Sequence, residues 1–363
     1  MNPEIAFIYK KSATGEILSH PVHQEWAKSM GATSTGIRQF RSPGPIRKTF
    51  IQDVVSAVTD SVDTNSDVFV FEEPATLYYS PLLRKTHPDA TQLYLETNWR
   101  RYPQARDGEG RSPISNLKRW NNYLDARLLD HIIEREIDGF VTVSQMVRES
   151  LLVDFGKPTA VVSPYVKDDV SRHLRRCEPD YDTSRACVVC KNRYHKGVDR
   201  LVDAWSVVRN EIPDAELRIV GSDHPQSYAR QPGIETTGYV DDLREVFSNC
   251  SVYVHPARFD ACPVSVLEAM YAGLPTIVTD TTGTKEFVES VDESLICGSS
   301  TTDIAEAVAD LFRRDSWDRA SLGTDAREAV RGQTESHSIE RFNSKVKDLI
   351  RRVDHSSKRS TTR

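Results

Sequence analysis

Short apolar runs and helical patterns alternate along almost the whole chain. The runs have the length of buried strands, and the stretches between them repeat apolar residues at helical spacing. The expected strands are residues 5–9, 67–71, 92–96, 139–143, 159–163, 186–190, 216–220, 234–237, 251–255 and 276–279. The expected helices are residues 46–62, 116–136, 145–154, 198–210, 241–248, 263–272, 302–314 and 317–331. The alternation predicts parallel α/β sheets, and the similar size of the two halves predicts two Rossmann-like domains.

Residues 251–280 hold the most informative local pattern. The expected strand 251–255 leads into a loop that carries Asp260, a helix that carries Glu268 follows, and a further strand begins after Pro275. Strand, loop, helix and strand in this order form a βαβ unit. Ligands of such sheets bind where the carboxyl ends of strands meet the amino ends of helices.

The amino end of this helix suits an anion. Pro263 fits the first helical position, which leaves the backbone N–H groups of Val264 and Ser265 available to a diphosphate. The two acidic residues, with seven between them, are followed by the run Ala-Met-Tyr-Ala-Gly-Leu-Pro. This segment resembles the donor-site motif of retaining glycosyltransferases of the GT-B fold, in particular family 4. The alternative is an ordinary amphipathic helix in a doubly wound sheet.

The resemblance implies a GT-B architecture, with two Rossmann-like α/β domains that face a central cleft. We expect a first, acceptor-side domain over residues 1–165, with the boundary near Ser163–Asp169, and a nucleotide-sugar donor domain over residues 166–335. The polar segment Arg172–Ser184 is the expected linker. A C-terminal helix over residues 336–353 would return to the first domain, and residues 354–363 would be a disordered tail.

The loop after the expected strand 186–190 offers cations for a diphosphate. In the family, a Gly-Arg pair follows this strand and a Lys-Gly pair comes five residues beyond the Arg. Lys196-Gly197 matches the second pair, whereas Cys190 and Lys191 replace the first. Lysine keeps the charge but loses the planar fork of arginine, and Arg193 could supply the missing guanidinium. Each of these cations could equally be a solvated loop charge.

The carboxylates of the motif take roles that the resemblance implies. Glu268 would hold the ribose hydroxyls of the nucleotide, and Asp260, where Glu is usual, would contact the donor sugar with a side chain one methylene shorter. The loop with Val240 would lie near the base, although its glycine could be a simple turn residue. Thr282 replaces a glycine of the family pattern, which weakens a site role for Glu286.

The first half of the chain carries weaker signals. Glu96 stands where the family has a His near the sugar, and it could line the sugar pocket or be a plain strand-end carboxylate; Glu72-Glu73 leaves the same choice open. Residues 99–127 interleave Arg and Lys with Trp and Tyr. This stretch could bind a phosphorylated acceptor or give a peripheral contact with anionic lipid headgroups, or it could be a mobile loop and a solvated helix face.

Composition narrows the class of protein further. The 363 residues carry a formal net charge of −6, which excludes a generally basic nucleic-acid binder. No apolar run approaches the roughly 20 residues of a membrane span, and the amino terminus is typical of a first strand rather than a signal peptide. We therefore expect a soluble protein of the cytoplasm, or of the inner face of the membrane. The pair Cys187 and Cys190 lies in an expected buried strand without a second pair, so we interpret the cysteines as structural.

The resemblance implies a retaining glycosyltransferase that moves a hexose from a nucleoside-diphosphate sugar to a hydroxyl of a glycan, a lipid-linked saccharide or a metabolite. We expect no metal and no other cofactor, since no Asp-x-Asp motif stands at a strand end; lysines and a helix amino end would then stabilise the diphosphate. Two alternatives stay open: a phosphorylase or epimerase on the same fold, and a non-catalytic nucleotide-sugar-binding subunit. The sequence does not name the base, the sugar or the acceptor.

Overall fold

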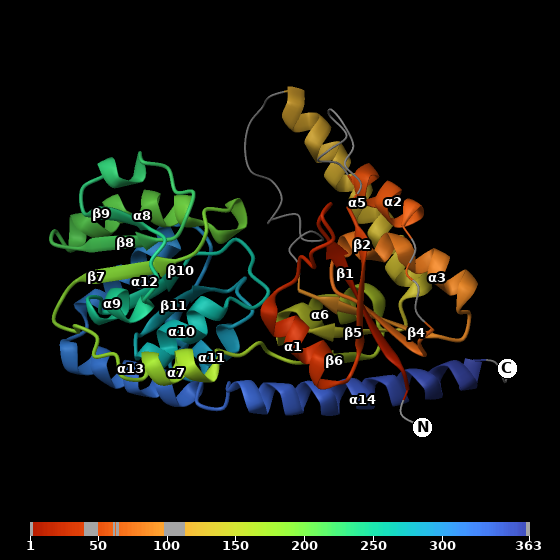
Figure 1. Ribbon diagram of the computed structural model, residues 1–363. Coiled ribbons are helices and arrows are strands. Elements are labelled where there is room, and N and C mark those ends of the chain that lie inside the picture. Colours follow the sequence, from red (N-terminus) through yellow and green to blue (C-terminus); the bar gives the residue numbers. More distant parts are fainter. Residues whose placement is uncertain (1–2, 40–49, 61, 63–64, 98–112, 361–363) are drawn as a thin grey trace. The chain divides into compact units, whose positions relative to one another are not determined.

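The computed structural model describes residues 3–39, 50–60, 62, 65–97 and 113–360, and the chain divides into two units (Figure 1). Among these residues, the first unit holds those up to Ser163 and those from Ser338 on, and the second holds Pro164–His337. Each unit contains one six-stranded sheet in which every neighbouring pair is parallel. The expected α/β class, with two Rossmann-like sheets, is confirmed.

The first sheet has the order β2-β1-β3-β4-β5-β6. Its strands are β1 (Ile5–Lys11), β2 (Thr33–Arg38), β3 (Val68–Phe71), β4 (Thr91–Glu96), β5 (Gly139–Thr142) and β6 (Thr159–Val161). Strands β3, β4 and β5 are buried at every position. A strand buried on both faces reads as a continuous apolar run, which is why these strands could be predicted.

Helices cover both faces of this sheet. They are α1 (Pro21–Ser29), α2 (Phe50–Thr59), the 3₁₀ helix η2 (Pro74–Tyr79), α3 (Ser80–Thr86), α5 (Pro113–Glu136), α6 (Gln145–Phe155) and α14 (Glu335–Ser360). Helices α2, α3 and α5 pack against η2 and one another, and α14 lies on the other face (Figure 1). Trp26 of α1 stacks on Phe342 of α14 with ring centroids 4.7 Å apart, and Phe342 also contacts Phe7 of β1.

Helix α14 is longer than the sequence analysis expected. It begins at Glu335 and continues to Ser360, so residues 354–360 are helical rather than a disordered tail, and residues 361–363 lie outside the described part. No glycine or proline interrupts this stretch, and Leu349 and Val353 lie close enough to Gly139 to touch a side chain there. The helix is therefore anchored in the first unit by apolar contacts.

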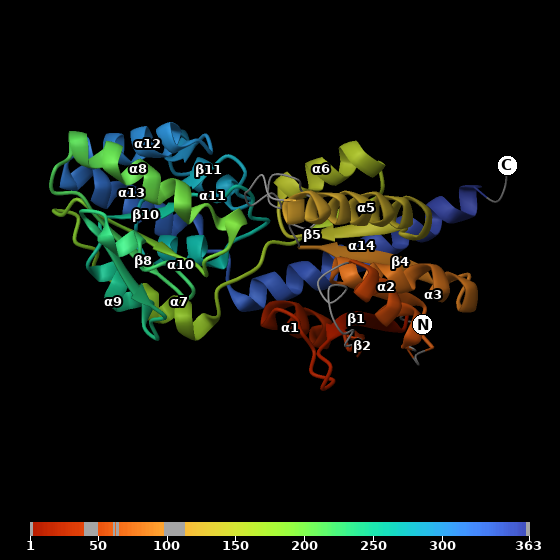
Figure 2. The same cartoon turned by 90° about the horizontal axis from the view of Figure 1, so that it is seen from above.

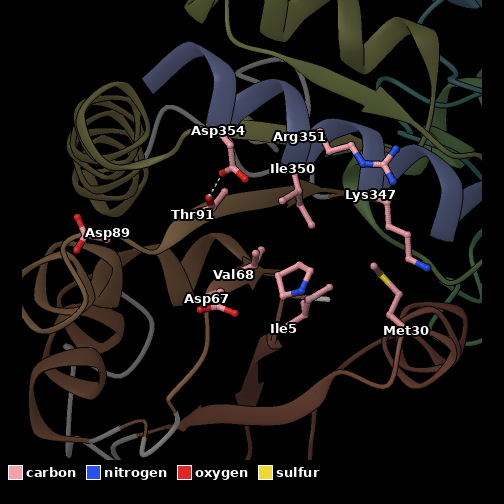
Figure 3. A pocket seen from close by; sticks show the side chains of 11 residues that line it. Ile5, Met30, Asp67, Val68, Asp89, Thr91, Lys347, Ile350, Arg351 and Asp354 are labelled. Atoms are coloured by element: carbon pink, nitrogen blue, oxygen red, sulfur yellow. Dashed lines mark hydrogen bonds between the residues drawn. The ribbon is translucent and has the colours of Figure 1, made fainter. Parts of the chain in front are cut away.

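The first unit has a groove of about 570 Å³ between α14 and the amino ends of β1, β3 and β4. Figure 3 shows the side chains that line it. Ile5, Val68 and Ile350 supply apolar walls, and Lys347 and Asp354 supply charge at its rim. Ligands of parallel sheets bind at the carboxyl edge. This groove lies at the opposite edge, so we do not place the candidate site there.

The second sheet has the order β12-β11-β10-β7-β8-β9. Its strands are β7 (Arg185–Val189), β8 (Glu216–Val220), β9 (Ile234–Gly238), β10 (Val252–His255), β11 (Thr276–Thr279) and β12 (Ile296–Cys297). From β7 the chain adds strands outward on one side through β8 and β9. It then returns to the other side of β7 with β10, so the order reverses between β7 and β10.

The second sheet is also covered on both faces (Figure 2). The longer helices are α7 (Asp168–Leu174), α8 (Val198–Glu211), α9 (Leu243–Ser248), α10 (Val264–Ala272), α12 (Thr301–Arg313) and α13 (Ser316–Ala329). The shorter ones are α11 (Lys285–Glu289) and the 3₁₀ helices η4 (Tyr194–Lys196), η5 (Tyr228–Arg230) and η6 (Glu293–Leu295). Helices α8 and α12 pack together, and α10 packs on α7, α9 and α13.

The prediction that Arg172–Ser184 is a linker is wrong, because this segment packs as part of the second unit. Its first residues belong to α7, Cys177 is buried, and the Tyr181 hydroxyl donates a 2.6 Å hydrogen bond to the Gly273 carbonyl. Arg327 of α13 donates to the Cys177 carbonyl at 2.6 Å. The segment is polar on average, but its few apolar and aromatic side chains pack into the second unit.

Candidate active site

The reversal of strand order between β7 and β10 positions the candidate site. Two loops leave the sheet at this point, one from Cys190 to Gly197 after β7 and one from Pro256 to Pro263 after β10. In an open parallel sheet a ligand can bind at such a switch point, because the helices that follow the two strands lie on opposite faces of the sheet. The residues predicted from the motif in the second half of the chain lie on or near these loops.

Gly197 lets the two loops meet. Its φ is +69°, a conformation that favours glycine, and a Cβ atom there would lie 1.9 Å from the Pro256 carbonyl oxygen. The backbone N–H of Arg258 donates to the His195 carbonyl at 2.8 Å, which joins the loops a second time. The Lys-Gly pair of the motif therefore places Lys196 beside the loop that holds Asp260.

Lys196 and Asp260 form an ion pair at the centre of the site. The same oxygen of Asp260, Oδ2, also lies 2.9 Å from Nε2 of His255 at the end of β10. The backbone of Asp260 is fixed as well, since its N–H donates to Thr281 at 3.2 Å and its carbonyl accepts from Gly283 at 2.8 Å. Lys196 and His255 thus hold the carboxylate of Asp260, and the loop around Thr281 and Gly283 holds its backbone.

The charges of this cluster are set by burial and by one another. Burial alone would raise the pKa of Asp260, but Lys196 and His255 outweigh burial and hold the pKa well below its usual range. Burial lowers the pKa of Lys196, yet Asp260 raises it further, so the ammonium stays charged. Burial lowers the pKa of His255 more than Asp260 raises it. A neutral His255 that donates to the carboxylate carries its proton on Nε2.

Helix α10 begins beside this cluster. Pro263 is its N-cap, with φ −70° and ψ 116°, so the expectation that Pro263 occupies the first helical position is wrong by one residue. The helix starts at Val264, and the first N–H groups of a helix have no preceding turn to donate to; of those in the first turn, that of Val266 donates to the Pro263 carbonyl at 3.2 Å. The Ser265 hydroxyl accepts a 2.9 Å hydrogen bond from Tyr253. The backbone N–H groups of Val264 and Ser265 are thus placed at a helix end where an anion is favoured.

A cavity of about 600 Å³ lies in the second unit on the α10 side of the switch point. It is lined by residues of α7, of the loops after β7, β8 and β9, and of α10. The predicted residues among them are Lys191, Val240 and Glu268. The volume is in the range of small-molecule sites, and the cavity brings together a cation, a carboxylate and apolar walls.

Glu268 has no hydrogen bond or ion pair from its side chain to any described residue. Burial raises the pKa of Glu268 from its ordinary 4.5 to about 7, with no other cause. A carboxyl group left without a donor in a cavity is costly to ionise. Ligand hydroxyls would supply the missing donors, and a vicinal diol could supply two.

Lys196, Asp260, Val264 and Ser265 are not among the residues that line the cavity. Two further predicted residues belong neither to the cavity nor to the Lys196–Asp260 cluster. Arg193 is exposed and forms a 3.6 Å ion pair with Asp223, and it does not line the cavity. Glu96 ends β4 in the first unit, is buried, and accepts a 3.3 Å hydrogen bond from Tyr94. Of residues 99–127, those from 99 to 112 lie outside the described part. Tyr123 in α5 is more than half exposed.

The sequence analysis missed His255, Arg258 and His173 as parts of the site. His255 meets Asp260, five residues further along the chain. The other two have partners distant in sequence: Arg258 meets Asp199 at 2.6 Å, and His173 meets Asp242 at 2.9 Å beside the cavity. The position of His255 at a strand carboxyl end was the one signal that could have drawn attention to it.

The close approach at Gly197 gives a stability prediction. Gly197→Ala is expected to destabilise the second unit by several kcal/mol, because both the positive φ and the Pro256 oxygen oppose a Cβ. Gly238→Ala is the matched control: its φ is +70°, but nothing lies within 4 Å of the added carbon. That variant should lose only about 1–2 kcal/mol. Denaturant midpoints of the two variants would show equal losses if the loop contact were unimportant.

A family match covers part of the second unit. Residues 185–314 match the family model described as glycosyl transferases group 1. This match confirms the resemblance of the motif to glycosyltransferases of that group. An uncharacterized glycosyltransferase of Haemophilus influenzae is 30% identical over 112 residues, which cover 28% of this chain and 32% of that protein. The chain thus spans about a third of this relative's length.

Solved structures of this fold cover nearly the whole chain. Sucrose-phosphate synthase from Thermosynechococcus elongatus superposes with a TM-score of 0.69 over 97% of this chain and 99% of that one, at 16% identity. The structure of Anabaena HepE in complex with UDP-glucose superposes with a TM-score of 0.61. The superposition covers 96% of this chain and 100% of that one, at 12% identity. At these identities the likeness establishes the GT-B glycosyltransferase fold and no more.

Among the helices that the structure describes, none is long and apolar enough to cross a membrane. Within the same part of the chain, no group of three or more His, Cys, Asp or Glu side chains is arranged to hold a metal ion.

Proposed function

We propose that this chain is a retaining glycosyltransferase that transfers a hexose from a nucleoside-diphosphate sugar to a hydroxyl acceptor. The observation that carries the proposal is the juxtaposition of Lys196, the amino end of α10 and the Glu268 cavity around one switch point. A nucleoside diphosphate needs cations and N–H groups for its phosphates and an acceptor for its ribose hydroxyls. The group 1 family match and the UDP-glucose complex of HepE support this assignment.

The chemistry follows from what each group can stabilise. The bond between sugar C1 and the diphosphate oxygen breaks, and C1 bonds to the acceptor oxygen on the same face. The acceptor proton passes to the departing phosphate oxygen. Negative charge grows on the diphosphate, where Lys196 and the N–H groups of Val264 and Ser265 would stabilise it in a partly buried site. We propose that these groups act without a divalent metal, with Lys191 as a further cation at the cavity.

The role of Asp260 differs from a simple sugar contact. One of its oxygens is already occupied by Lys196 and His255. We propose that Asp260 orients the Lys196 ammonium and leaves only its other oxygen, Oδ1, for a sugar hydroxyl. This would adapt the site to a shorter acidic side chain than the family's usual Glu.

A thermal-shift panel tests the donor site. Purified protein is heated with each nucleoside diphosphate and its sugars, with EDTA and then with Mg²⁺. We expect one base to stabilise the protein in EDTA, by about 2.7 kcal/mol at a hundred times the dissociation constant. NMR of the product then gives the anomeric configuration. Inversion would contradict retention, a requirement for Mg²⁺ would contradict metal-free transfer, and release of a sugar 1-phosphate only with added orthophosphate would indicate a phosphorylase.

A further inference from the structure

Arg258 makes the most extensive set of contacts in the loop after β10. Its guanidinium binds both oxygens of Asp199, each at 2.6 Å, and donates to the Tyr194 carbonyl at 2.8 Å. The same group lies over the Tyr194 ring, 3.9 Å from its centroid. The residue is only 7% exposed. Such a bidentate, stacked and buried arginine fixes the geometry of its partners.

The partners of Arg258 flank Lys196 in the sequence. Tyr194 begins the 3₁₀ turn that ends at Lys196, and Asp199 lies in the first turn of α8, just beyond Gly197. The guanidinium therefore binds one residue before Lys196 and one residue after it. Burial would raise the pKa of Asp199, but Arg258 outweighs it and the pKa is lowered, so the pair is charged on both sides.

We propose that Arg258 is a positioning residue: it holds the turn of Lys196 so that the ammonium lies where the diphosphate charge develops. This inference rests on the proposed function. The acceptors of the Arg258 guanidinium, Tyr194 and Asp199, lie on either side of Lys196, so Arg258 is placed to act through Lys196. A displacement of about 1 Å at a reacting group is enough to lower a rate by about a hundredfold.

A double-mutant cycle separates positioning from general stability. Arg258→Lys keeps a charge near Asp199 but loses the fork and the stacking. We expect it to lower the rate of nucleoside-diphosphate release from the donor by about ten- to a hundredfold. In a Lys196→Met background the same change should have less than about a twofold effect, because the group that it positions is gone. Asp199→Asn should likewise lower the release rate only when Lys196 is present. It replaces the arginine variant in the cycle if Arg258→Lys folds poorly.

Arg185→Lys is the matched control. Arg185 also pairs with a carboxylate, Glu216 at 2.6 Å, and with a backbone carbonyl, that of Asn249 at 3.1 Å, but at the amino end of β7. The Arg185→Lys variant should therefore leave the rate of nucleoside-diphosphate release unchanged. Equal losses from Arg258→Lys in both backgrounds, or a rate like wild type, would overturn the inference while the donor site stands. A wild-type chain that binds no nucleotide in the thermal-shift panel would overturn the proposed function and this inference together.

Discussion

Lys196→Met is expected to lower the rate of sugar transfer by about a hundred- to a thousandfold. The removal of one preorganised group that stabilises developing negative charge typically costs this much. The rate is measured as nucleoside-diphosphate release from the donor that the panel identifies. The exposed Lys167, at the N-cap of α7, provides the control Lys167→Met, which should keep the wild-type rate.

Lys196→Met should also destabilise the protein, because it leaves Asp260 as a charge of low exposure beside the neutral His255. The loss of one partner of a buried pair costs about 3–5 kcal/mol, and this pair, which is only partly buried, should lie toward the lower end. The double variant Lys196→Met, Asp260→Asn removes the orphan charge. It should regain much of the melting temperature but none of the activity. If it regained activity too, Lys196 would serve only to neutralise Asp260.

The strands and the motif could be predicted because their signals are local. Strand β10 and helix α10 read as an apolar run and a helical pattern, and the spacing of Asp260 and Glu268 is fixed within that one helix–loop unit. Strand β2 was missed because it is an edge strand, half exposed and interrupted by Gly36, so it lacks the continuous apolar run of its neighbours. Strand β12 has only two residues.

The rest of the site depends on contacts that a local pattern does not encode. Arg258 and Asp199 are separated by 59 residues, and nothing near either residue indicates the other. Arg193 and Lys191 have the same pattern of a loop cation in the sequence, yet Lys191 lines the cavity and Arg193 instead forms an ion pair with Asp223. The place of Glu268 in the cavity wall was equally hidden, since a carboxylate at this helix position could as well have faced bulk solvent.

Glu268→Gln is expected to stabilise the unliganded protein above pH 7 while it weakens nucleotide binding. The pKa of Glu268 is raised from 4.5 to about 7, which corresponds to about 3 kcal/mol against the ionised form. A raised pKa contributes stability that is fully present below pH 4.5 and is lost as the pH rises through 7. Gln carries no charge and avoids this loss. The melting temperatures of variant and wild type should therefore separate progressively between pH 5 and pH 8, with the variant higher.

Nucleotide affinity should change in the opposite direction. Ribose hydroxyls bind best to the ionised carboxylate, so wild-type affinity should rise about tenfold from pH 6 to pH 8 as the ionised fraction grows. Glu268→Gln should bind about ten- to a hundredfold more weakly at pH 8 and lose most of this pH dependence. Glu245→Gln, which changes an exposed glutamate of α9, should move neither quantity. A stability difference that stays flat with pH would show that Glu268 is not a titrating group, and an unchanged affinity would remove it from the ribose site. The opposite signs would mark a carboxylate kept at a cost in stability for the ligand that it receives.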